Sequence, residues 1–206
     1  MHLDEPSTAA PQRRPGRRRW LFAVLVALLL GQMAVAMVVT ALQQTPTIDE
    51  PVYVGTAVTY VQQHSLRYNP EHPPLGKLII GCGLAFAHPH FHSAFTGTEQ
   101  AVGQHLLYES GNDARRLMLL ARLPVIVMSL LFGLVVFAFA RDLVGPAGGL
   151  VALTLCAFSP DVIAHGSLAT LDVPAAGFLL TKGGGVNAHR GLDFDGRRAS
   201  HPEYGP

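Results

Sequence analysis

The chain has 206 residues, a formal net charge of +1 and a mean hydropathy of +0.29. Charged residues make up 14% of it, whereas they make up about a quarter of a typical soluble chain. This composition argues against a soluble globular domain, and the near-zero net charge gives no sign of a nucleic-acid partner.

Residues 1–19 are rich in proline and arginine and are predicted to form a basic cytoplasmic tail. From Trp20 to Leu42 the sequence carries no charge and is long enough to span a hydrocarbon core of about 30 Å. This run exceeds the apolar core of a usual signal peptide, so a retained helix is favoured over a cleaved leader. The arginines just before it predict a cytoplasmic N-terminus, which places the next segment on the outer face of the membrane.

The outer segment begins with a predicted amphipathic helix between Glu50 and His64. Asp49 is suited to cap this helix, and Pro51 is tolerated in its first turn. One semi-apolar face recurs at helical spacing, which predicts a helix lying on the membrane surface. The residues of that face are Tyr53, Ala57, Tyr60, Val61 and His64.

Proline pairs then predict an extended turn between residues 69 and 74, because proline fixes its own φ and disfavours helix in the residue before it. Leu75 to Ala87 is apolar but short for a span, which favours a second interfacial or re-entrant helix.

Two further apolar segments complete the predicted membrane domain. Leu117–Ala140 is the second predicted span, with Arg122 near its outer end, and residues 147–164 form the third. A fourth span opens at Val173 but stops within a few residues. Residues 181–206 are predicted to be a disordered tail, which an out-of-frame reading would explain. The expected fold is therefore all-α: polytopic membrane helices, with amphipathic juxtamembrane helices in the first outer loop. Residues 20–180 would be the N-terminal part of a larger membrane domain.

The outer segment gathers ionisable side chains whose position near lipid suggests chemistry. A carboxylate at Asp49 or Glu50 can act as a general base, or the pair can simply favour the start of a helix. Lys77 can hold a lipid phosphate or snorkel at the interface. Arg122 needs a partner if it lies within a span, and a phosphate or Asp172 are candidates. Asp172 can equally cap the helix that follows it.

Other groups of residues give weaker indications of function. His88, His90 and His92 alternate as metal ligands would on an extended strand, but no further ligand is visible, and an interfacial loop is favoured. The cysteines, Cys82 and Cys156, lie inside apolar runs and form no disulfide framework. The sequence requires no cofactor, although a divalent metal is compatible with it. The acidic run at residues 193–196 resembles a metal-binding loop but is not interpreted as one.

Taken together, four motifs resemble a known family, the polytopic GT-C glycosyltransferases of glycosyltransferase family 39. This family includes protein O-mannosyltransferases and bacterial aminoarabinose transferases that act on lipid A. The resemblance covers roughly residues 20–180, and it is specific because the motifs occur together and in order. The motifs are Asp49-Glu50-Pro51-x-Tyr53, Asn69-Pro70-Glu71-His72-Pro73-Pro74-Leu75-Gly76-Lys77, Ala121-Arg122-Leu123-Pro124, and Ser159-Pro160-Asp161-Val162-Ile163-Ala164-His165-Gly166 with Thr170-Leu171-Asp172.

The resemblance implies an enzyme that moves a sugar from a polyprenyl-phosphate carrier to a protein, lipid or glycan acceptor at the outer face of the plasma or inner membrane. It implies that Asp49 is the catalytic acid of the first outer loop and that Glu50 is its neighbour. The implied substrate-binding residues are Tyr53, His72, Lys77, Arg122 and Asp172. Family members have many more spans, so the chain alone is expected to be inactive. The alternative is a non-enzymatic membrane anchor or assembly subunit; a small transporter is disfavoured because the polar groups gather in an outer loop.

Overall fold

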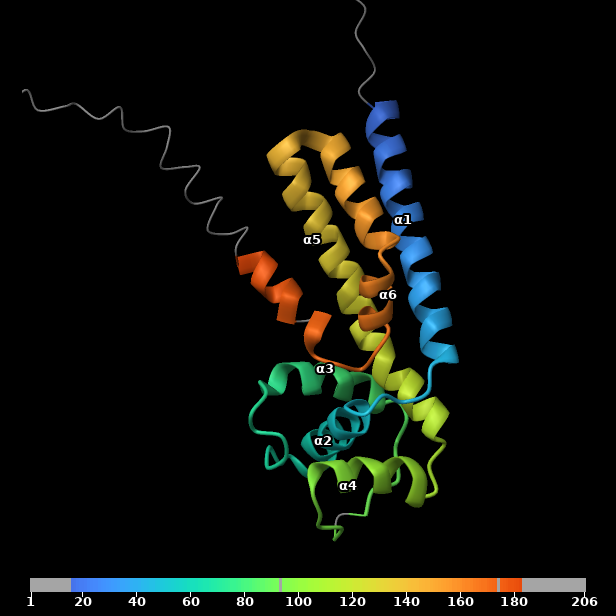
Figure 1. Ribbon diagram of the computed structural model, residues 1–206, viewed down its shortest axis with the longest axis vertical. Coiled ribbons are helices and arrows are strands. Elements are labelled where there is room, and N and C mark those ends of the chain that lie inside the picture. The colour runs from blue at the N-terminus through green and yellow to red at the C-terminus, as the bar shows by residue number, and fades with distance from the viewer. Residues whose placement is uncertain (1–15, 93, 174, 183–206) are drawn as a thin grey trace, which may run out of the picture.

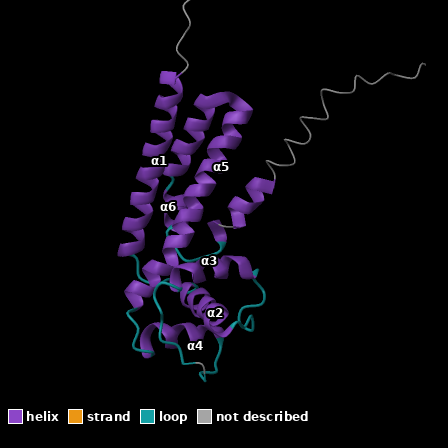
Figure 2. Cartoon of the chain, turned by 180° about the vertical axis from the view of Figure 1, so that it is seen from behind, coloured by secondary structure: helices purple, strands orange, loops and turns teal. Residues whose placement is uncertain are grey.

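The computed structural model describes residues 16–92, 94–173 and 175–182, and the regular elements in these ranges are all helices (Figure 1, Figure 2). This confirms the predicted all-α class. Residues 175–182 are also helical. The elements are α1 (Gly16–Gln43), α2 (Glu50–Gln63), α3 (Pro74–Leu84), α4 (Glu99–Gln104), the π-helical turn η1 (His105–Glu109), α5 (Ala114–Ala157) and α6 (Pro160–Gly166).

The helices form an elongated bundle with a lobe at one end (Figure 1). In the bundle, α1 packs along α5, and α6 lies against both. In the lobe, α2 packs between α3 and α4, and α3 also contacts α5. The lobe is therefore built from the segment that separates the two long helices in sequence.

Helix α5 contains a sharp reversal at Gly145, and its two arms run side by side (Figure 1). Gly145 has φ 86° and ψ 175°, a backbone conformation that favours glycine, and Pro146 follows it at the start of the returning arm. Gly149 in the returning arm lies close to Phe137 and Arg141 in the first arm. The first arm contains the second predicted span. The third predicted span, 147–164, is divided between the returning arm and α6, because the helix is interrupted before Pro160.

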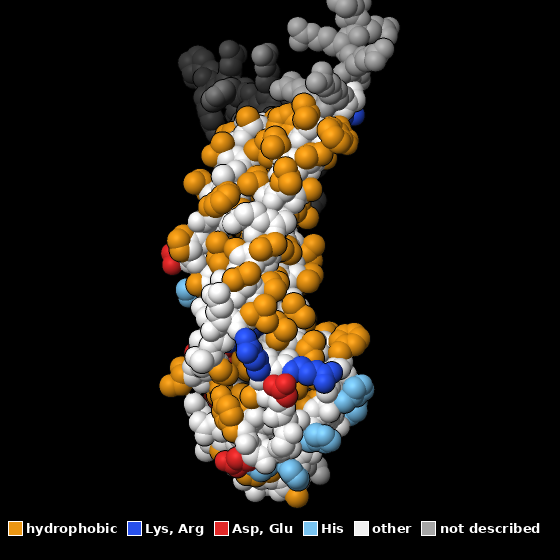
Figure 3. All heavy atoms as spheres, turned by 90° about the vertical axis from the view of Figure 1, so that its right-hand side faces the viewer, with side chains coloured by type: hydrophobic (Ala, Val, Ile, Leu, Met, Phe, Trp, Pro, Cys, Tyr) orange, Lys and Arg blue, Asp and Glu red, His pale blue; other side chains and the backbone are white. Residues whose placement is uncertain are grey.

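The bundle has an apolar surface. Arg19–Gln43 and Ala114–Ala157 are each long and apolar enough to cross a membrane. On the face shown in Figure 3, hydrophobic side chains cover most of the bundle, whereas most charged and histidine side chains lie at the lobe. Exposed apolar surface of this extent is typical of contact with lipid or with another protein.

The lobe is organised around α2, which is enclosed rather than lying on a surface. The predicted helix is confirmed at Glu50–Gln63, but its residues from Val54 to Tyr60 are all buried, so a single semi-apolar face does not describe it. Close approach to α4 explains this burial: a Cβ on Gly103 would overlap the backbone of Pro51. The second predicted helix is confirmed as α3. The core of the lobe includes Val54, Ala57, Val58, Ile80, Leu84, Leu106 and Leu107.

Two predictions fall on the ends of the chain. Of the predicted basic tail, residues 1–15 lie outside the described residues, and 16–19 already belong to α1. The predicted disordered tail lies outside them from residue 183 onward, and residues 181 and 182 are helical.

Candidate functional site

Asp49 lies exposed at the start of α2. It is the N-cap residue of this helix, with φ −90° and ψ −25°, but its side chain makes no capping hydrogen bond. Its backbone carbonyl accepts a hydrogen bond from the Tyr53 N–H at 3.2 Å. The helix therefore begins without using the Asp49 carboxylate, which faces solvent and is accessible to a ligand.

Tyr53 lies one turn into α2 and brings together groups from three segments of the chain. Its ring meets the ring of His72 edge to face, with centroids 5.9 Å apart. Burial raises the pKa of the Tyr53 hydroxyl, and the nearby carboxylates of Asp49 and Asp172 raise it further. His72 and both aspartates are exposed. Four of the seven candidate residues thus lie in one region of the lobe, here called the acidic cluster: Tyr53 and His72, whose rings are in contact, and Asp49 and Asp172, whose charges act on the Tyr53 hydroxyl.

The segment carrying Asp172 is anchored to the lobe by contacts on both sides. The Ala169 N–H donates to Oε1 of Glu50 at 2.8 Å, and the Leu171 side chain packs against Gly76 at the start of α3. Thr170 is buried, and its hydroxyl has no hydrogen-bond partner among the described residues. These contacts, made between segments far apart in sequence, hold the chain just before Asp172 against the starts of α2 and α3.

Glu50 points the other way and is fully buried. Its Oε2 accepts hydrogen bonds from Arg122 Nη2 at 2.7 Å and from the Thr47 N–H at 2.9 Å. Burial alone would raise the pKa of Glu50. Hydrogen bonds from Arg122, Thr47 and Ala169 outweigh burial and hold the pKa below its ordinary value of 4.5. Glu50 is therefore an ionised structural partner in this geometry, with its oxygens already occupied.

Arg122 joins Glu50 to the end of α1. Its Nε donates to Glu50 Oε1 at 2.8 Å, which completes a two-point ion pair. The guanidinium also donates to carbonyls at the end of α1 and just after it: Nη1 to Ala41 at 2.6 Å and to Gln44 at 3.0 Å, and Nη2, which already donates to Glu50, to Thr45 at 3.2 Å. A cation at a helix C-terminus also opposes the negative end of the helix dipole. The partner of Arg122 is thus Glu50 rather than Asp172, and no side-chain nitrogen of Arg122 lacks an acceptor.

Lys77 is also buried, inside the proline-rich turn. Its Nζ donates to the backbone carbonyls of Asn69 and His72, the latter at 3.1 Å, and to the Tyr60 hydroxyl at 3.3 Å. Burial lowers the pKa of Lys77 below its ordinary value of 10.5, and nearby Glu99 and Glu71 offset part of this effect. Lys77 therefore holds the turn that carries His72. In this conformation its ammonium group neither snorkels to the surface nor faces open space.

Sequence patterns alone did not indicate the roles of Tyr60 and Asn69. Tyr60 donates to the Tyr68 carbonyl at 3.1 Å and accepts from Lys77. Asn69 adopts φ 51°, a left-handed conformation that non-glycine residues rarely adopt. The signal that was available is asparagine's tolerance of this conformation, which turns the Asn69 carbonyl toward Lys77.

The histidine-rich segment forms a loop, as favoured from the sequence. His92 contacts His105 through ring nitrogens 3.4 Å apart, and the other ring nitrogen of His105 lies 2.9 Å from Glu109. His105 thus uses both nitrogens within the protein. Across the described ranges, no group of three or more His, Cys, Asp or Glu side chains is arranged to hold a metal ion.

No family model, curated protein or solved structure matches the chain. The site is therefore interpreted from its own geometry. The resemblance to glycosyltransferase family 39 therefore stays a prediction based on four motifs. The acidic cluster brings together Asp49, Tyr53, His72 and Asp172, whereas Glu50, Lys77 and Arg122 lie buried behind it.

Proposed function

We propose that the chain is an integral membrane glycosyltransferase, or the N-terminal part of one, that takes a sugar from a polyprenyl-phosphate carrier. The observation that carries this proposal is the acidic cluster. Two exposed carboxylates from segments far apart in sequence, Asp49 and Asp172, both act electrostatically on the Tyr53 hydroxyl, in the lobe at the end of the bundle of long apolar helices. The motif resemblance supports the same function and supplies the class of donor.

In the proposed reaction, Asp49 takes the proton from the attacking hydroxyl or amine of the acceptor. The nucleophile forms a bond to the anomeric carbon of the sugar, the bond from that carbon to the phosphate oxygen breaks, and the polyprenyl phosphate leaves with the electron pair. Asp49 suits the role of base because its carboxylate is exposed and makes no capping hydrogen bond. Glu50 suits it less, because Arg122 and two backbone N–H groups occupy its oxygens.

Lys77 and Arg122 support this site from behind in the proposed mechanism. Lys77 holds the turn that carries His72, and Arg122 holds Glu50, which in turn holds the segment leading to Asp172. We call them positioning residues for this reason. Of the residues in the acidic cluster, His72 is the one whose ring N–H can donate a hydrogen bond to the leaving phosphate.

The proposed membrane arrangement places the lobe on the outer face and the N-terminus in the cytoplasm. The arginines just before and at the start of α1 favour this orientation, and the reversal of α5 lies at the same end of the bundle as the start of α1 (Figure 1). Single cysteines at two exposed positions test it, in a chain whose native cysteines are replaced by serine. An impermeant maleimide added to intact cells should label Glu109→Cys in the lobe and leave Arg141→Cys, beside the reversal, unlabelled. Labelling of Arg141→Cys but not of Glu109→Cys would show the opposite topology, with the lobe in the cytoplasm.

A sugar-transfer assay with polyprenyl-phosphate-linked donors, run on membranes containing the full chain, tests the function. Asp49→Asn should lower kcat at least a hundredfold, because general-base catalysis contributes about 10²–10⁴-fold. Asp172→Asn should lower activity as well. Asp161→Asn changes an exposed aspartate in the first turn of α6, outside the acidic cluster, and serves as the matched control.

Two results would count against the proposal. Transfer that is unaltered in Asp49→Asn would remove the base assigned here. Absence of transfer in the wild type with every donor tried, together with retention of a partner protein on the lobe, would favour an anchor or assembly subunit.

A further inference from the structure

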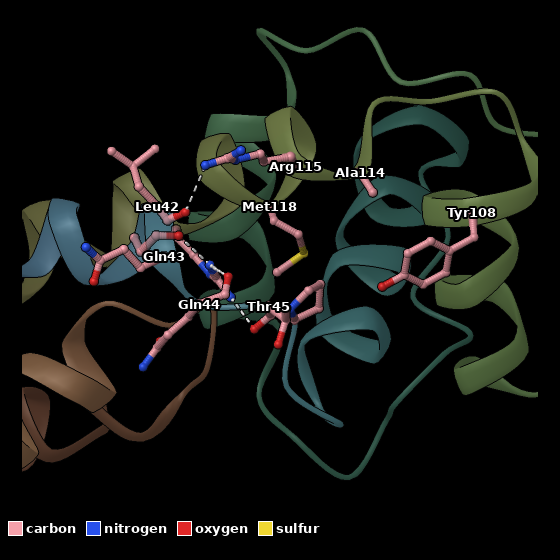
Figure 4. Close-up of a pocket in the computed structure, with 11 residues that line it drawn as sticks. Leu42, Gln43, Gln44, Thr45, Tyr108, Ala114, Arg115 and Met118 are labelled. Carbon is pink, nitrogen blue, oxygen red and sulfur yellow. Dashed lines mark hydrogen bonds between the residues drawn. The ribbon is translucent and has the colours of Figure 1, made fainter.

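A pocket of about 520 Å³ lies where the end of α1 meets the start of α5 (Figure 4). It is formed by the last residues of α1 and the chain just after it, by the first turns of α5, and by Tyr108 from η1. None of the residues of the acidic cluster lines it. The pocket is therefore a separate feature of the lobe–bundle junction.

The walls of this pocket are largely apolar. Leu42 and Pro46 contribute from the α1 side, and Ala114 and Met118 from α5. Figure 4 shows the Tyr108 ring on the far side, with its hydroxyl directed toward the middle of the pocket. Walls of this kind suit an organic group better than a hydrated ion.

The pocket carries positive charge. Two arginines line it, Arg115 and Arg122, and no acidic side chain is among its described lining residues. The charge of Arg122 is balanced by Glu50 behind it. Arg115 is exposed and donates one hydrogen bond, from Nη2 to the Leu42 carbonyl at 3.3 Å. Because a guanidinium has five N–H donors, most donors of Arg115 stay available to a ligand.

An apolar strip leads away from the pocket along α1. Val35, Val39 and Leu42 are spaced four and three residues apart, so they lie on one face of the helix, and all three are exposed. Leu42 belongs to both the strip and the pocket. A ligand with a charged head and a long apolar chain would match the two parts together.

We propose that this pocket binds the head group of an anionic phospholipid of the surrounding bilayer, with the lipid phosphate on Arg115 and an acyl chain along the α1 strip. The proposal rests on the membrane location proposed above but not on sugar transfer. A basic residue at the membrane surface attracts anionic lipid, and the pocket adds a defined place for the head group. The bound lipid would join the end of α1 to the start of α5 and so stabilise the junction that supports the lobe.

Native mass spectrometry of the purified full chain in detergent tests this, with phosphatidylglycerol and phosphatidylcholine as probes. The wild type should bind phosphatidylglycerol more tightly. Arg115→Ala should weaken that binding about fivefold, the usual effect of one basic group near a membrane surface. Phosphatidylcholine should lose less, because its trimethylammonium group offsets the charge of its phosphate. Arg116→Ala is the matched control, because Arg116 is also exposed and adjacent but does not line the pocket. Ala114→Trp should fill the pocket and weaken binding with both arginines intact.

Three results would overturn the proposal. Equal loss in Arg115→Ala and Arg116→Ala would show diffuse surface attraction. Full displacement of the lipid by inorganic phosphate would show a site for a free anion. Unchanged binding in Ala114→Trp would place the lipid elsewhere. Asp49→Asn should bind the lipid as the wild type does, so a failure of the catalytic proposal and a failure of this one give different results.

Discussion

Removal of the Arg122 side-chain charge is the most direct test of how the lobe is held on the bundle. In Arg122→Met the long side chain is kept, but the guanidinium and its five hydrogen bonds are lost. Glu50 then stays buried without its cation. The carbonyls of Ala41, Gln44 and Thr45 also lose their donor.

The expected cost is about 3–5 kcal/mol of unfolding free energy, the range for breaking a buried ion pair by removing one partner. Arg122 and Glu50 are 1% and 0% exposed, so water cannot easily replace the lost contacts. The carbonyls of Gln44 and Thr45 add little beyond this, because both residues are exposed and water reaches them. The Ala41 carbonyl is buried, so the loss of its donor adds to the cost. The unfolding free energy of a domain is about 5–15 kcal/mol, so this single change would remove a large part of it.

The free energy of unfolding can be measured by titration of the detergent-solubilised chain with a denaturing detergent, followed by circular dichroism. Arg115→Ala is the matched control, because Arg115 also donates to a carbonyl at the end of α1 but is exposed. That control should cost less than about 1 kcal/mol. A double-mutant cycle with Glu50→Gln isolates the pairwise energy.

Equal destabilisation by Arg122→Met and Arg115→Ala would refute the reasoning. So would a double-mutant cycle with no coupling between Glu50 and Arg122, since the ion pair would then contribute nothing beyond the separate side chains.

Two further predictions concern the groups behind the acidic cluster. The pKa of Glu50 is lower in the folded chain than its ordinary value of 4.5. The ionised carboxylate therefore contributes its full share of the folding free energy above pH 4.5, and this share is lost as the pH falls through the lowered pKa. The difference in unfolding free energy between wild type and Glu50→Gln should be constant near neutral pH and shrink below pH 4.5. Lys77→Met should release the turn that carries His72 and so increase tryptic cleavage after the exposed Arg67, whereas Leu78→Ala, an exposed neighbour on α3, should leave the cleavage rate unchanged.

The local features of the fold were predictable because they depend on residues close together in sequence. The apolar run of α1 and the proline in the first turn of α2 predicted both helices. The reversal at Gly145-Pro146 was also predictable, since glycine permits the positive φ and proline begins the next helix. The enclosure of α2 was not predictable, because it depends on the close approach of Gly103 in α4.

Candidate site residues were predicted as a set, but their individual environments were not. Asp49 and Glu50 are adjacent in sequence and belong to the same motif. In the folded chain Asp49 is exposed, whereas Glu50 is enclosed by Arg122, Thr47 and Ala169. One step along a helix turns the side chain by about a quarter turn, which here separates solvent from the protein interior.

By itself, the sequence determined that the chain forms apolar helices joined by a polar segment and that acids, a histidine and basic residues would gather near their ends. Hydrophobic periodicity, prolines and glycines act over a few residues, so these features need no knowledge of distant contacts. Only the tertiary structure decided which basic side chains are free to bind a phosphate. Arg122 and Lys77 look like ligands for phosphate in the sequence, yet the fold pairs one with Glu50 and encloses the other in backbone carbonyls. A buried charge must find its partners wherever the packed chain brings them, and that choice depends on contacts between segments far apart in sequence.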